Sequence, residues 1–584
     1  MLKNFVKAVL FPSPEVLQER INKASGEVCK PGGPCEIGQV EVRGNKYRNF
    51  MVGPQTLPEL LKFSNESFGT RECIVYQNER LTFKDVYAKA ELMAGALVEM
   101  GLKPGDRVGI CSRNYPEWII AFCAIIHAGG VIVPMNSWWQ GRELEYGISH
   151  SGMKIIIADE PRMKHVADRL PSLGVKGIVL RAKKTPEGII SWKHALKIGS
   201  KAPRVKLPTV DPDSDAVIMY TSGTTGNPKG VRQTHRGVCQ AILAINHVEQ
   251  SLRAGMGYLA AFIPLPCQLL AVPLFHVTGT HAVLLAGLLL GRKTVIMHKW
   301  DPKEALVSIE KEKATHFTGV PTMILEITGH KDAKKHDLSS LLVCTGGGAP
   351  MPPALFPKLL DKAPSCQPGQ GYGMTETNAI TTINTGLNQM TRPKSCGKAQ
   401  PVCDVRVINE EGNVLPTGKP GELCVRGPTV MAGYYKDDEA TKKVFLEDGW
   451  MLTGDMAEID EDGFVYIVDR LKELVIRGGE NISCAEVEAA AYEHSAVAEC
   501  AAFGVPDERL GEELTLAVFL KDGENVDEEG LRKFIAERLA HYKVPRFVHI
   551  REESLPRGPT GKVMRRIAKQ QYLAKNPPHI QAKM

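Results

Sequence analysis

Helices that alternate with short strands constrain the fold of this chain more than any other feature of its sequence. From residue 82 onward, the amphipathic stretch 85–100 precedes a β-branched segment at 106–110, and the apolar stretch 117–128 precedes another at 131–133. Strands that alternate with helices over hundreds of residues pack as a parallel sheet with helices on both faces. The sequence therefore predicts an α/β fold, with doubly wound sheets in a large N-terminal domain. Further strands are expected at 155–157, 177–180 and 216–219.

This alternation gives way near residue 400 to short strands that are separated by Gly and Asp turns. Strands at 405–408, 421–427 and 463–468 indicate a small β-barrel-like subdomain at about 400–470. A compact α+β pattern follows, with helices expected at 485–494 and 528–539 and strands at 499–505 and 514–520. We therefore predict an N-terminal domain of residues 1–470 and a small, mobile C-terminal domain of residues 471–584.

The first 60 residues show no such alternation, and they contain the turn-rich patch Lys-Pro-Gly-Gly-Pro at 30–34. We expect this segment to be irregular apart from a short amphipathic helix close to the N-terminus. It carries no small-residue cleavage site, so it is a poor secretory signal.

The composition is that of a folded soluble protein. The 584 residues are 43% hydrophobic and 24% charged, with a net charge of +6. No dense run of Lys and Arg accompanies this charge, so we expect anionic small ligands and no nucleic acid. The 14 cysteines are scattered without a Cys-x-x-Cys pair, which indicates reduced thiols and a cytoplasmic protein, with neither a zinc site nor a disulfide framework.

Two uncharged stretches, 118–141 and 254–291, are long enough to be tested as membrane spans. Glycines at 129–130 interrupt the first, and prolines at 264, 266 and 273 interrupt the second, so we expect no transmembrane segment. Peripheral contact with a membrane stays open, and a monomer or homodimer is expected. The last three residues, Ala582-Lys583-Met584, resemble a variant of the Ser-Lys-Leu address, so the peroxisome stays an alternative to the cytoplasm.

The segment 220–230, Tyr-Thr-Ser-Gly-Thr-Thr-Gly-Asn-Pro-Lys-Gly, follows the apolar strand expected at 216–219. Its glycines let backbone N–H groups converge, its hydroxyls add donors, and Lys229 adds a positive charge, which together suit a polyphosphate. It differs from the usual P-loop because Lys229 precedes Gly and not Ser or Thr. The candidate phosphate-binding residues are Thr221, Ser222, Gly223, Thr224, Thr225, Gly226 and Lys229.

This loop resembles the phosphate loop of the adenylate-forming (AMP-binding) superfamily, which includes acyl-CoA synthetases, firefly-type luciferases and the adenylation domains of peptide synthetases. Further motifs similar to those of the superfamily follow in its order, so that the resemblance runs from about residue 60 to about residue 570. They are Gly-Gly-Gly-Ala-Pro at 346–350, Gly-Tyr-Gly-Met-Thr-Glu at 371–376, Gly-Trp-Met-Leu-Thr-Gly-Asp at 449–455, Asp-Arg-Leu-Lys-Glu at 469–473, Arg-Gly-Gly-Glu-Asn at 477–481 and Pro-Thr-Gly-Lys at 559–562. The chain departs from the usual pattern at Gly558 and Pro559 and in the uncharged insert 255–268.

The resemblance implies a nucleotide site in the N-terminal domain. Tyr372 is expected to stack on adenine, Thr375 to contact the α-phosphate, and Glu376 to hold Mg²⁺, which prefers oxygen ligands. Thr453-Gly454 is interpreted as a turn, and Asp455 after it is expected to accept two hydrogen bonds from the ribose hydroxyls. A wall for the adenine or the acyl-adenylate is expected from Gly347, Gly348 and Ala349, and Arg470 is expected to contact ribose and phosphate.

The resemblance also assigns roles to residues that act in turn at this site. Lys562 is expected to be the catalytic lysine of the first half-reaction, and His276 a gate residue beside the carboxylate. Lys472 matches the position about which the C-terminal domain pivots. Gly478 and Gly479 are expected to line the passage for the pantetheine arm of coenzyme A, because paired glycines let a thin chain pass between backbones.

These expectations describe an enzyme that uses ATP, Mg²⁺ and coenzyme A to convert a small carboxylic acid into its CoA thioester through an acyl-AMP. A non-polar acyl pocket is predicted from Phe275, Val277, Thr278, Val320, Met323 and Met374, which favours a medium- or long-chain fatty acid. The alternatives are an aryl-acid CoA ligase, a carrier-protein loading enzyme and a luciferase-like oxidase. A non-catalytic acyl or nucleotide sensor and a membrane fatty-acid transport protein are less favoured, because Lys229, Glu376 and Lys562 are all present and prolines break the apolar stretches.

Overall fold

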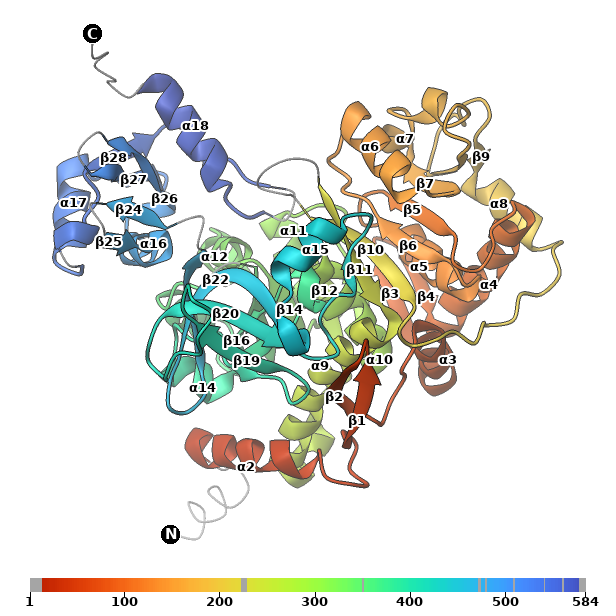
Figure 1. Ribbon diagram of the computed structural model, residues 1–584, viewed down its shortest axis with the longest axis horizontal. Coiled ribbons are helices and arrows are strands. Elements are labelled where there is room, and N and C mark those ends of the chain that lie inside the picture. Colours follow the sequence, from red (N-terminus) through yellow and green to blue (C-terminus); the bar gives the residue numbers. More distant parts are fainter. Residues whose placement is uncertain are drawn as a thin grey trace.

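The computed structural model describes residues 13–221, 228–348, 351–470, 474–477, 480–507, 510–539, 541–558 and 561–576. Within these residues, two large sheets, a four-stranded sheet and a two-stranded hairpin form the main body, and a separate α+β unit carries the C-terminal part of the chain (Figure 1). This arrangement confirms the predicted α/β class. The predicted tripeptide address at 582–584 lies outside the described residues.

The first large sheet has eight strands in the order β21-β11-β10-β6-β5-β7-β8-β9. The pairs from β10 through β9 are parallel, whereas β11 is antiparallel to both β10 and β21. Strands expected at 106–110, 131–133, 155–157, 177–180 and 216–219 all lie in it. Its strands are β5 (Arg107–Cys111), β6 (Val131–Pro134), β7 (Ile155–Asp159), β8 (Lys176–Leu180), β9 (Ile190–Ser191), β10 (Asp215–Thr221), β11 (Lys229–Thr234) and β21 (Gly433–Tyr434).

The second large sheet has nine strands in the order β18-β17-β16-β15-β14-β12-β13-β3-β4. The six strands from β16 to β3 run parallel, so their carboxyl ends share one edge of the sheet. The strands are β3 (Glu72–Tyr76), β4 (Glu79–Thr82), β12 (Cys267–Leu270), β13 (Lys293–Ile296), β14 (His316–Gly319), β15 (Val343–Gly346), β16 (Gln367–Tyr372), β17 (Thr382–Thr385) and β18 (Lys398–Ala399).

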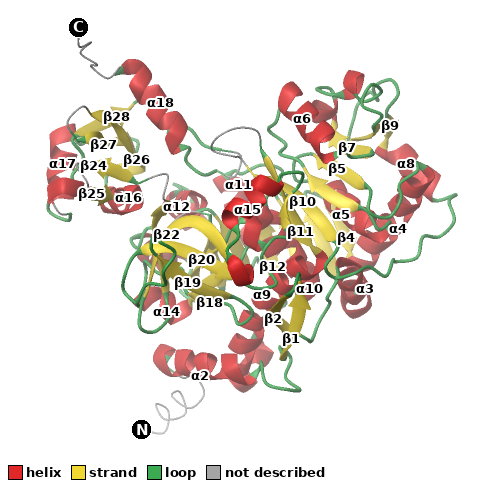
Figure 2. Ribbon diagram, viewed as in Figure 1, coloured by secondary structure: helices red, strands yellow, loops and turns green. Residues whose placement is uncertain are grey.

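Helices cover these sheets (Figure 2), and one continuous apolar core contains side chains of both sheets. At its centre lies α5, which is buried along its length apart from Glu117, and in which Trp118 stacks on Phe122. The uncharged stretch that begins at residue 118 is therefore a core helix and strand. The helices of the main body are α2 (Pro14–Glu27), α3 (Leu57–Phe68), α4 (Phe83–Glu99), α5 (Pro116–His127), α6 (Gly141–Ser151), α7 (Glu160–Met163), α8 (Trp192–Gly199), α9 (His235–Met256), α10 (Ala286–Leu290), α11 (Pro302–Glu312), α12 (Pro321–Gly329), α13 (Leu355–Lys362), α14 (Gly386–Thr391) and α15 (Asp438–Val444).

The predicted β subdomain is a four-stranded antiparallel sheet, β19-β20-β22-β23. Its strands are β19 (Asp404–Ile408), β20 (Gly421–Arg426), β22 (Met451–Ile459) and β23 (Val465–Arg470). The sequence interpretation of Thr453-Gly454 as a turn is wrong, because both residues lie within β22. Gly454 has a φ of +74°, and the pairing with β20 shifts register beside it, so the strand bulges where the motif suggested a turn.

The C-terminal unit is a five-stranded sheet with helices packed on it. Its elements are β24 (Val475–Arg477), β25 (Glu480–Ile482), α16 (Cys484–Tyr492), β26 (Val497–Asp507), β27 (Gly511–Leu520), α17 (Glu528–Ala536), β28 (Phe547–Arg551) and α18 (Arg565–Lys575). The predicted helices and strands of this region all correspond to elements of the sheet or its cover. We propose the domain boundary at residues 470–471, at the end of β23.

The expectation that the first 60 residues are irregular apart from one short helix is wrong, because a β hairpin follows that helix. Pro14 starts α2, and the Ser13 hydroxyl accepts a hydrogen bond from the Val16 backbone, so the helix is capped. α2 packs along α9, where Ile21 lies against Gly255. A hairpin then follows, of β1 (Ile37–Val42) and β2 (Asn45–Phe50), whose turn places Arg43 and Gly44 at positive φ. A hairpin and tertiary packing therefore order this segment, although its sequence shows no clear periodic pattern.

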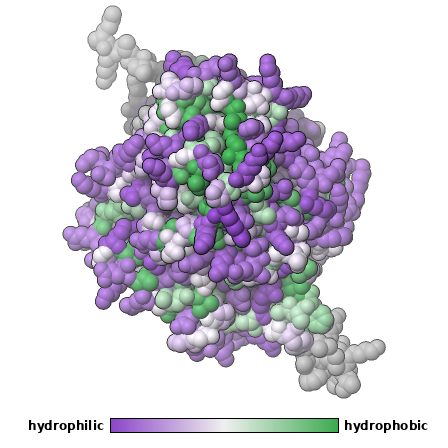
Figure 3. Space-filling model, turned by 90° about the vertical axis from the view of Figure 1, so that its right-hand side faces the viewer, coloured by the Kyte–Doolittle hydropathy of each residue, from purple (hydrophilic) through white to green (hydrophobic). Residues whose placement is uncertain are grey.

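Across the described part of the chain, no helix combines the length and the apolar character needed to cross a bilayer. The face of the molecule on the side of α4, α6 and α8 is mostly hydrophilic, and its apolar residues lie in small groups (Figure 3).

Close packing of α8 on α4 depends on a glycine, because a Cβ at Gly199 would clash with the carbonyl oxygen of Leu92. We expect Gly199→Ala to lower the free energy of unfolding by about 1–3 kcal/mol, since the two helices must separate to admit the methyl group. The matched control is Gly141→Ala at the start of α6, where a Cβ meets no atom within 4 Å. Urea unfolding of both variants measures the difference, and equal midpoints would contradict this packing account.

Candidate active site

The predicted phosphate loop connects two paired strands. β10 ends at Thr221 and β11 begins at Lys229, and these two residues face each other in the antiparallel register. The hairpin therefore holds both ends of the loop at a fixed separation. The candidate residues Ser222, Gly223, Thr224, Thr225 and Gly226 lie outside the described residues.

Lys229 and Glu376 are brought together by a residue that the sequence did not single out. β21 pairs with β11 and carries Tyr434. The Lys229 Nζ lies 4.8 Å from the centre of the Tyr434 ring, and the Tyr434 hydroxyl donates a hydrogen bond to Glu376 Oε1 at 3.0 Å. Burial and the neighbouring Glu376 carboxylate raise the pKa of Tyr434 above its ordinary value, so this hydroxyl stays a donor.

The short helix η5 (Thr375–Thr377) follows β16 and holds two of the predicted catalytic residues. Thr375 and Glu376 are both buried. The Gln233 side chain donates to the Thr375 carbonyl at 2.8 Å, and the Met431 N–H donates to the Glu376 carbonyl at 2.8 Å. Because these donors come from β11 and from the segment that precedes β21, elements of the first sheet fix the backbone of η5.

Tyr372 and Asp455, predicted to contact adenine and ribose, are direct neighbours. The Tyr372 hydroxyl donates to Asp455 Oδ2 at 2.7 Å, and Asp455 is 8% exposed. Burial and this carboxylate hold the pKa of Tyr372 well above its ordinary value. Arg470 stands opposite Asp455 in the β22–β23 pairing. One aromatic residue and one carboxylate therefore lie together at the end of β16.

Gly347 lies at the carboxyl ends of the parallel strands. It follows β15, and its N–H donates to the Gly319 carbonyl at the end of β14 at 3.2 Å. Gly348 has a φ of +76°, and no atom of the described residues lies within 4 Å of the position that a Cβ would take. Gly347 and Gly348 stay candidates for the wall of a flat ligand. Ala349 lies outside the described residues.

His276 lies beyond the carboxyl end of β12, directly before a π-helix, η3 (Thr278–Leu285). Its Nδ1 accepts a hydrogen bond from the Thr278 N–H at 3.3 Å. Burial, and secondly the positive charge of Lys562, lower the pKa of His276 to about 4, so the imidazole is neutral at physiological pH. The predicted pocket residues Phe275, Val277, Val320 and Met323 are buried, and Thr278 and Met374 are half-buried.

The loop that carries Lys562 belongs to the C-terminal unit but lies against the main body. A Cβ at Gly561 would lie 3.4 Å from Val320 and 3.5 Å from Met323. Arg557 forms an ion pair with Glu326 of α12 at 3.1 Å and another with Glu499 of the C-terminal unit at 2.7 Å. These contacts place Lys562, half-buried, on the same side as His276.

The predicted pivot and pantetheine residues, Lys472, Gly478 and Gly479, are not among the residues that the structure describes, and only the backbone of Arg470 is described. Next to the glycines, Arg477 forms a bidentate ion pair with Glu513 at 2.8 and 3.0 Å, and Glu513 is 1% exposed. This pair ties β24 to β27 within the C-terminal unit.

Comparison with known proteins places the chain in a family. Residues 61–435 match the family described as AMP-binding enzyme, and residues 486–562 match the AMP-binding enzyme C-terminal domain. The chain belongs to this adenylate-forming family. It is an AMP-forming acid–CoA ligase, of the acyl- or aryl-CoA ligase type.

Several relatives of this family share most of their length with the chain. A long-chain-fatty-acid–CoA ligase of Bacillus subtilis is 34% identical over 88% of the chain and 94% of its own length. A feruloyl-CoA synthase of an Amycolatopsis species is 35% identical over 83% and 92%. Among solved structures, o-succinylbenzoate coenzyme A synthetase of Bacillus subtilis, in complex with ATP and a magnesium ion, superposes with a TM-score of 0.72 at 27% identity, covering 87% of this chain and 98% of that one.

Sequence reasoning missed three of the contacts that organise the site in this family member. They are the Tyr434 bridge between Lys229 and Glu376, the Gln233 support of Thr375, and the Arg557–Glu326 ion pair. The aromatic pair Tyr434-Tyr435 directly after Gly433 was the available signal for the first. The other two depend on tertiary pairing and leave no local pattern.

The proximity of Lys562 to His276 can be tested through a titration. In Lys562→Gln, the loss of the positive charge makes protonation of His276 easier, so its pKa should rise from about 4 toward 6.5. Burial, the larger cause, persists in the variant and should keep the pKa below 6.5. NMR titration of ¹³C-labelled histidine measures this shift, and Lys569→Gln, whose lysine pairs with Glu512, is the control. An unchanged His276 pKa in Lys562→Gln would mean that the two residues lie apart in solution.

Proposed function

We propose that the protein is an ATP-dependent acyl-CoA synthetase that converts a medium- or long-chain fatty acid into its CoA thioester through an acyl-AMP. The observation that carries this proposal is the convergence of Lys229, Glu376 and the Lys562 loop from different parts of the chain on one edge of the second sheet. Parallel sheets place ligand-binding residues at the carboxyl ends of their strands, as here.

In the first step, the acid carboxylate attacks the α-phosphorus of ATP, and pyrophosphate leaves. Two anions at contact distance repel each other by several kcal/mol in a poorly solvated site. Lys229 from the main body and Lys562 from the C-terminal unit would supply positive charges that offset this repulsion. Such preorganised charge stabilises the transition state because it needs no rearrangement during the reaction.

The nucleotide would lie along the carboxyl edge of the second sheet. In this proposal Tyr372 stacks on adenine, Asp455 and Arg470 bind the ribose, and Gly347, Gly348 and Ala349 form the flat wall. Thr375, with Thr221, Ser222, Gly223, Thr224, Thr225 and Gly226, would contact the phosphates. The Tyr372–Asp455 hydrogen bond supports this arrangement because it holds the carboxylate beside the ring.

The donor set also fits a magnesium ion that is shared with the nucleotide. Among the described residues no cluster of three or more His, Cys, Asp or Glu side chains could hold a metal alone. Glu376 and the Thr375 hydroxyl offer oxygen ligands side by side, and Mg²⁺ is commonly bound by one or two carboxylates together with substrate phosphates. When bound, the ion would neutralise phosphate charge.

In the second step, the thiol of coenzyme A attacks the acyl carbonyl, the thioester bond forms, and AMP leaves as the phosphate–acyl bond breaks. We propose that the C-terminal unit turns about Lys472 between the steps, so that Lys562 leaves and Gly478 and Gly479 arrive. Lys562 and these glycines belong to one small unit, whose loop contacts the main body through Gly561 and through the Arg557–Glu326 ion pair.

The acid is proposed from the surroundings of His276. Phe275, Val277, Val320 and Met323 are buried and apolar, and the neutral imidazole would orient a carboxylate without adding charge. An aryl acid is the second candidate, because the chain is as similar to the feruloyl-CoA synthase as to the long-chain ligase. Acid-dependent ATP–pyrophosphate exchange over fatty, aryl and amino acids separates these, and exchange with aryl acids alone would overturn the fatty-acid proposal.

The role of Lys562 predicts unequal effects on the two steps. Lys562→Ala should lower acid-dependent ATP–pyrophosphate exchange by at least roughly 100-fold, because one of the charges that faces the reacting phosphate is lost. Thioester formation from synthetic acyl-AMP and coenzyme A should stay within about twofold of wild type, since Lys562 has left the site in that step. Equal loss of both activities would contradict the assignment.

The interdomain ion pair predicts a smaller effect of the same kind. Glu326→Gln removes the partner of Arg557 on the main body and leaves the Arg557–Glu499 pair intact. A partly exposed ion pair contributes up to about 1 kcal/mol, so the exchange rate should fall by roughly two- to fivefold while thioester formation from acyl-AMP is unchanged.

Glu493→Gln is the control for this variant, because it removes a carboxylate whose ion pair with Arg538 lies entirely within the C-terminal unit. Its exchange rate should match wild type. A comparable loss in both variants would show that the effect of Glu326→Gln comes from general destabilisation and not from domain docking.

A further inference from the structure

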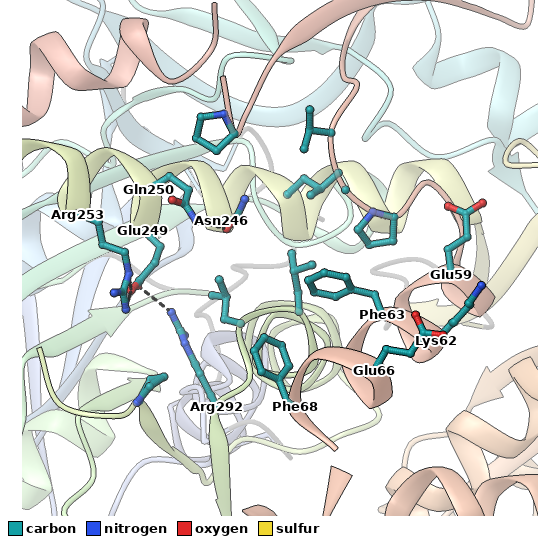
Figure 4. A pocket seen from close by; sticks show the side chains of 18 residues that line it. Glu59, Lys62, Phe63, Glu66, Phe68, Asn246, Glu249, Gln250, Arg253 and Arg292 are labelled. Carbon is teal, nitrogen blue, oxygen red and sulfur yellow. Dashed lines mark hydrogen bonds and ion pairs between the residues drawn. The ribbon is translucent and has the colours of Figure 1, made fainter. Parts of the chain in front are cut away.

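A second cavity of about 670 Å³ lies in the main body, outside the candidate active site (Figure 4). Its walls come from α3, α9 and α10 and from the segment around Gly53. The volume lies within the range of small-molecule sites in proteins. No residue that we assign to the nucleotide, the acid or coenzyme A lines it.

The direction of the strands separates this cavity from the catalytic edge. Pro266 and Arg292, which line it, directly precede β12 and β13, so they lie at the amino ends of parallel strands. His276, Gly347 and Tyr372 lie at or beyond the carboxyl ends. The continuous helical stretch from η3 to α10, residues 278–290, runs from the His276 side to the cavity, a length of about 20 Å.

One end of the cavity is cationic. Arg292 is 8% exposed, and its Nε finds no hydrogen-bond partner among the residues that the structure describes. The Arg292 guanidinium lies 3.4 Å from Glu249, which also pairs with Arg253 at 2.9 Å. Two guanidinium groups thus share one carboxylate, which leaves a net positive charge. The nearby His316 adds none, because burial and the two arginines hold its pKa well below the ordinary value.

The remaining walls are mostly apolar. Figure 4 shows Phe63 and Phe68 directed into the cavity, with Phe68 between Phe63 and Arg292 in this view. Glu59, Lys62 and Glu66 lie together at the other end, on α3. The apolar lining comprises Val52, Phe63, Phe68, Leu243, Leu289 and Leu290. A buried, incompletely bonded arginine next to an apolar wall favours a ligand with one anionic head and one hydrocarbon chain.

We propose that this cavity binds a single-chain amphipathic acid, with its anionic head on Arg292 and its chain against Phe63, Phe68 and Leu289. The site is separate from the one at which the acid is activated. The proposal does not depend on the proposed function, because none of the residues assigned to that function lines the cavity.

A photoreactive probe tests the proposal without ATP. Dodecyl sulfonate with a diazirine near the end of its chain carries a permanent anionic head and cannot be converted into a CoA thioester. Irradiation of the full-length protein followed by peptide mapping should place adducts in residues 57–68 and 286–292. Arg292→Gln should lower this labelling by roughly tenfold, because the charge-assisted contact is lost.

Two further measurements keep the result decisive if Arg292→Gln is less stable. Glu249→Gln should increase labelling, because the arginines lose the carboxylate that neutralises them, and a misfolded variant would not bind more tightly. The corresponding dodecanol probe, which lacks the charge, should label wild type and Arg292→Gln equally. Arg169→Gln, which removes an exposed arginine that pairs with Glu145, is the surface control. Adducts confined to residues near Val320 and Met323, or labelling unaffected by both Arg292→Gln and Glu249→Gln, would overturn the proposal.

Discussion

The contact of Tyr434 with both Lys229 and Glu376 is the interaction on which the candidate site depends. A buried carboxylate costs free energy unless a donor satisfies it, and the Tyr434 hydroxyl does so at 3.0 Å. The same ring faces the Lys229 ammonium group, so a cation and an anion are held near each other without a direct ion pair between them. Lys229 lies in the first sheet, whereas Glu376 follows a strand of the second. The two sheets must therefore keep a fixed relative position for this contact to form.

Lys562 adds a second requirement, because it comes from a different unit of the fold. Its loop contacts α12 through Gly561, and Arg557 secures the loop with an ion pair to Glu326. Both contacts are small compared with the continuous core that holds the main body together. We propose that the Lys562 loop is the part of the site that moves between the two steps of the reaction.

Much of this organisation could be predicted from the sequence because it is local. The alternation of helices and strands gave the sheets, and the glycine and hydroxyl pattern at 220–230 located the hairpin that β10 and β11 form. The bulge at Gly454 was misjudged because Thr-Gly pairs are common in turns, and only pairing with β20 shows that the chain continues as a strand. The hairpin before residue 60 was missed because no helix alternates with its two strands, and that alternation was the signal used for the rest of the fold. Tyr434 had one available signal, the aromatic pair after Gly433, whereas Gln233 and Arg557 could not be predicted, since each acts on a partner more than fifty residues away.

A structure of the full-length protein with ATP and Mg²⁺ tests the central claim most directly. The account predicts the triphosphate beside the turn between Thr221 and Lys229, with Lys229 Nζ and Lys562 Nζ both directed at phosphate oxygens and the metal on Glu376. Density for the triphosphate away from this turn, with Lys229 Nζ directed at the Tyr434 ring and away from the phosphates, would contradict this account.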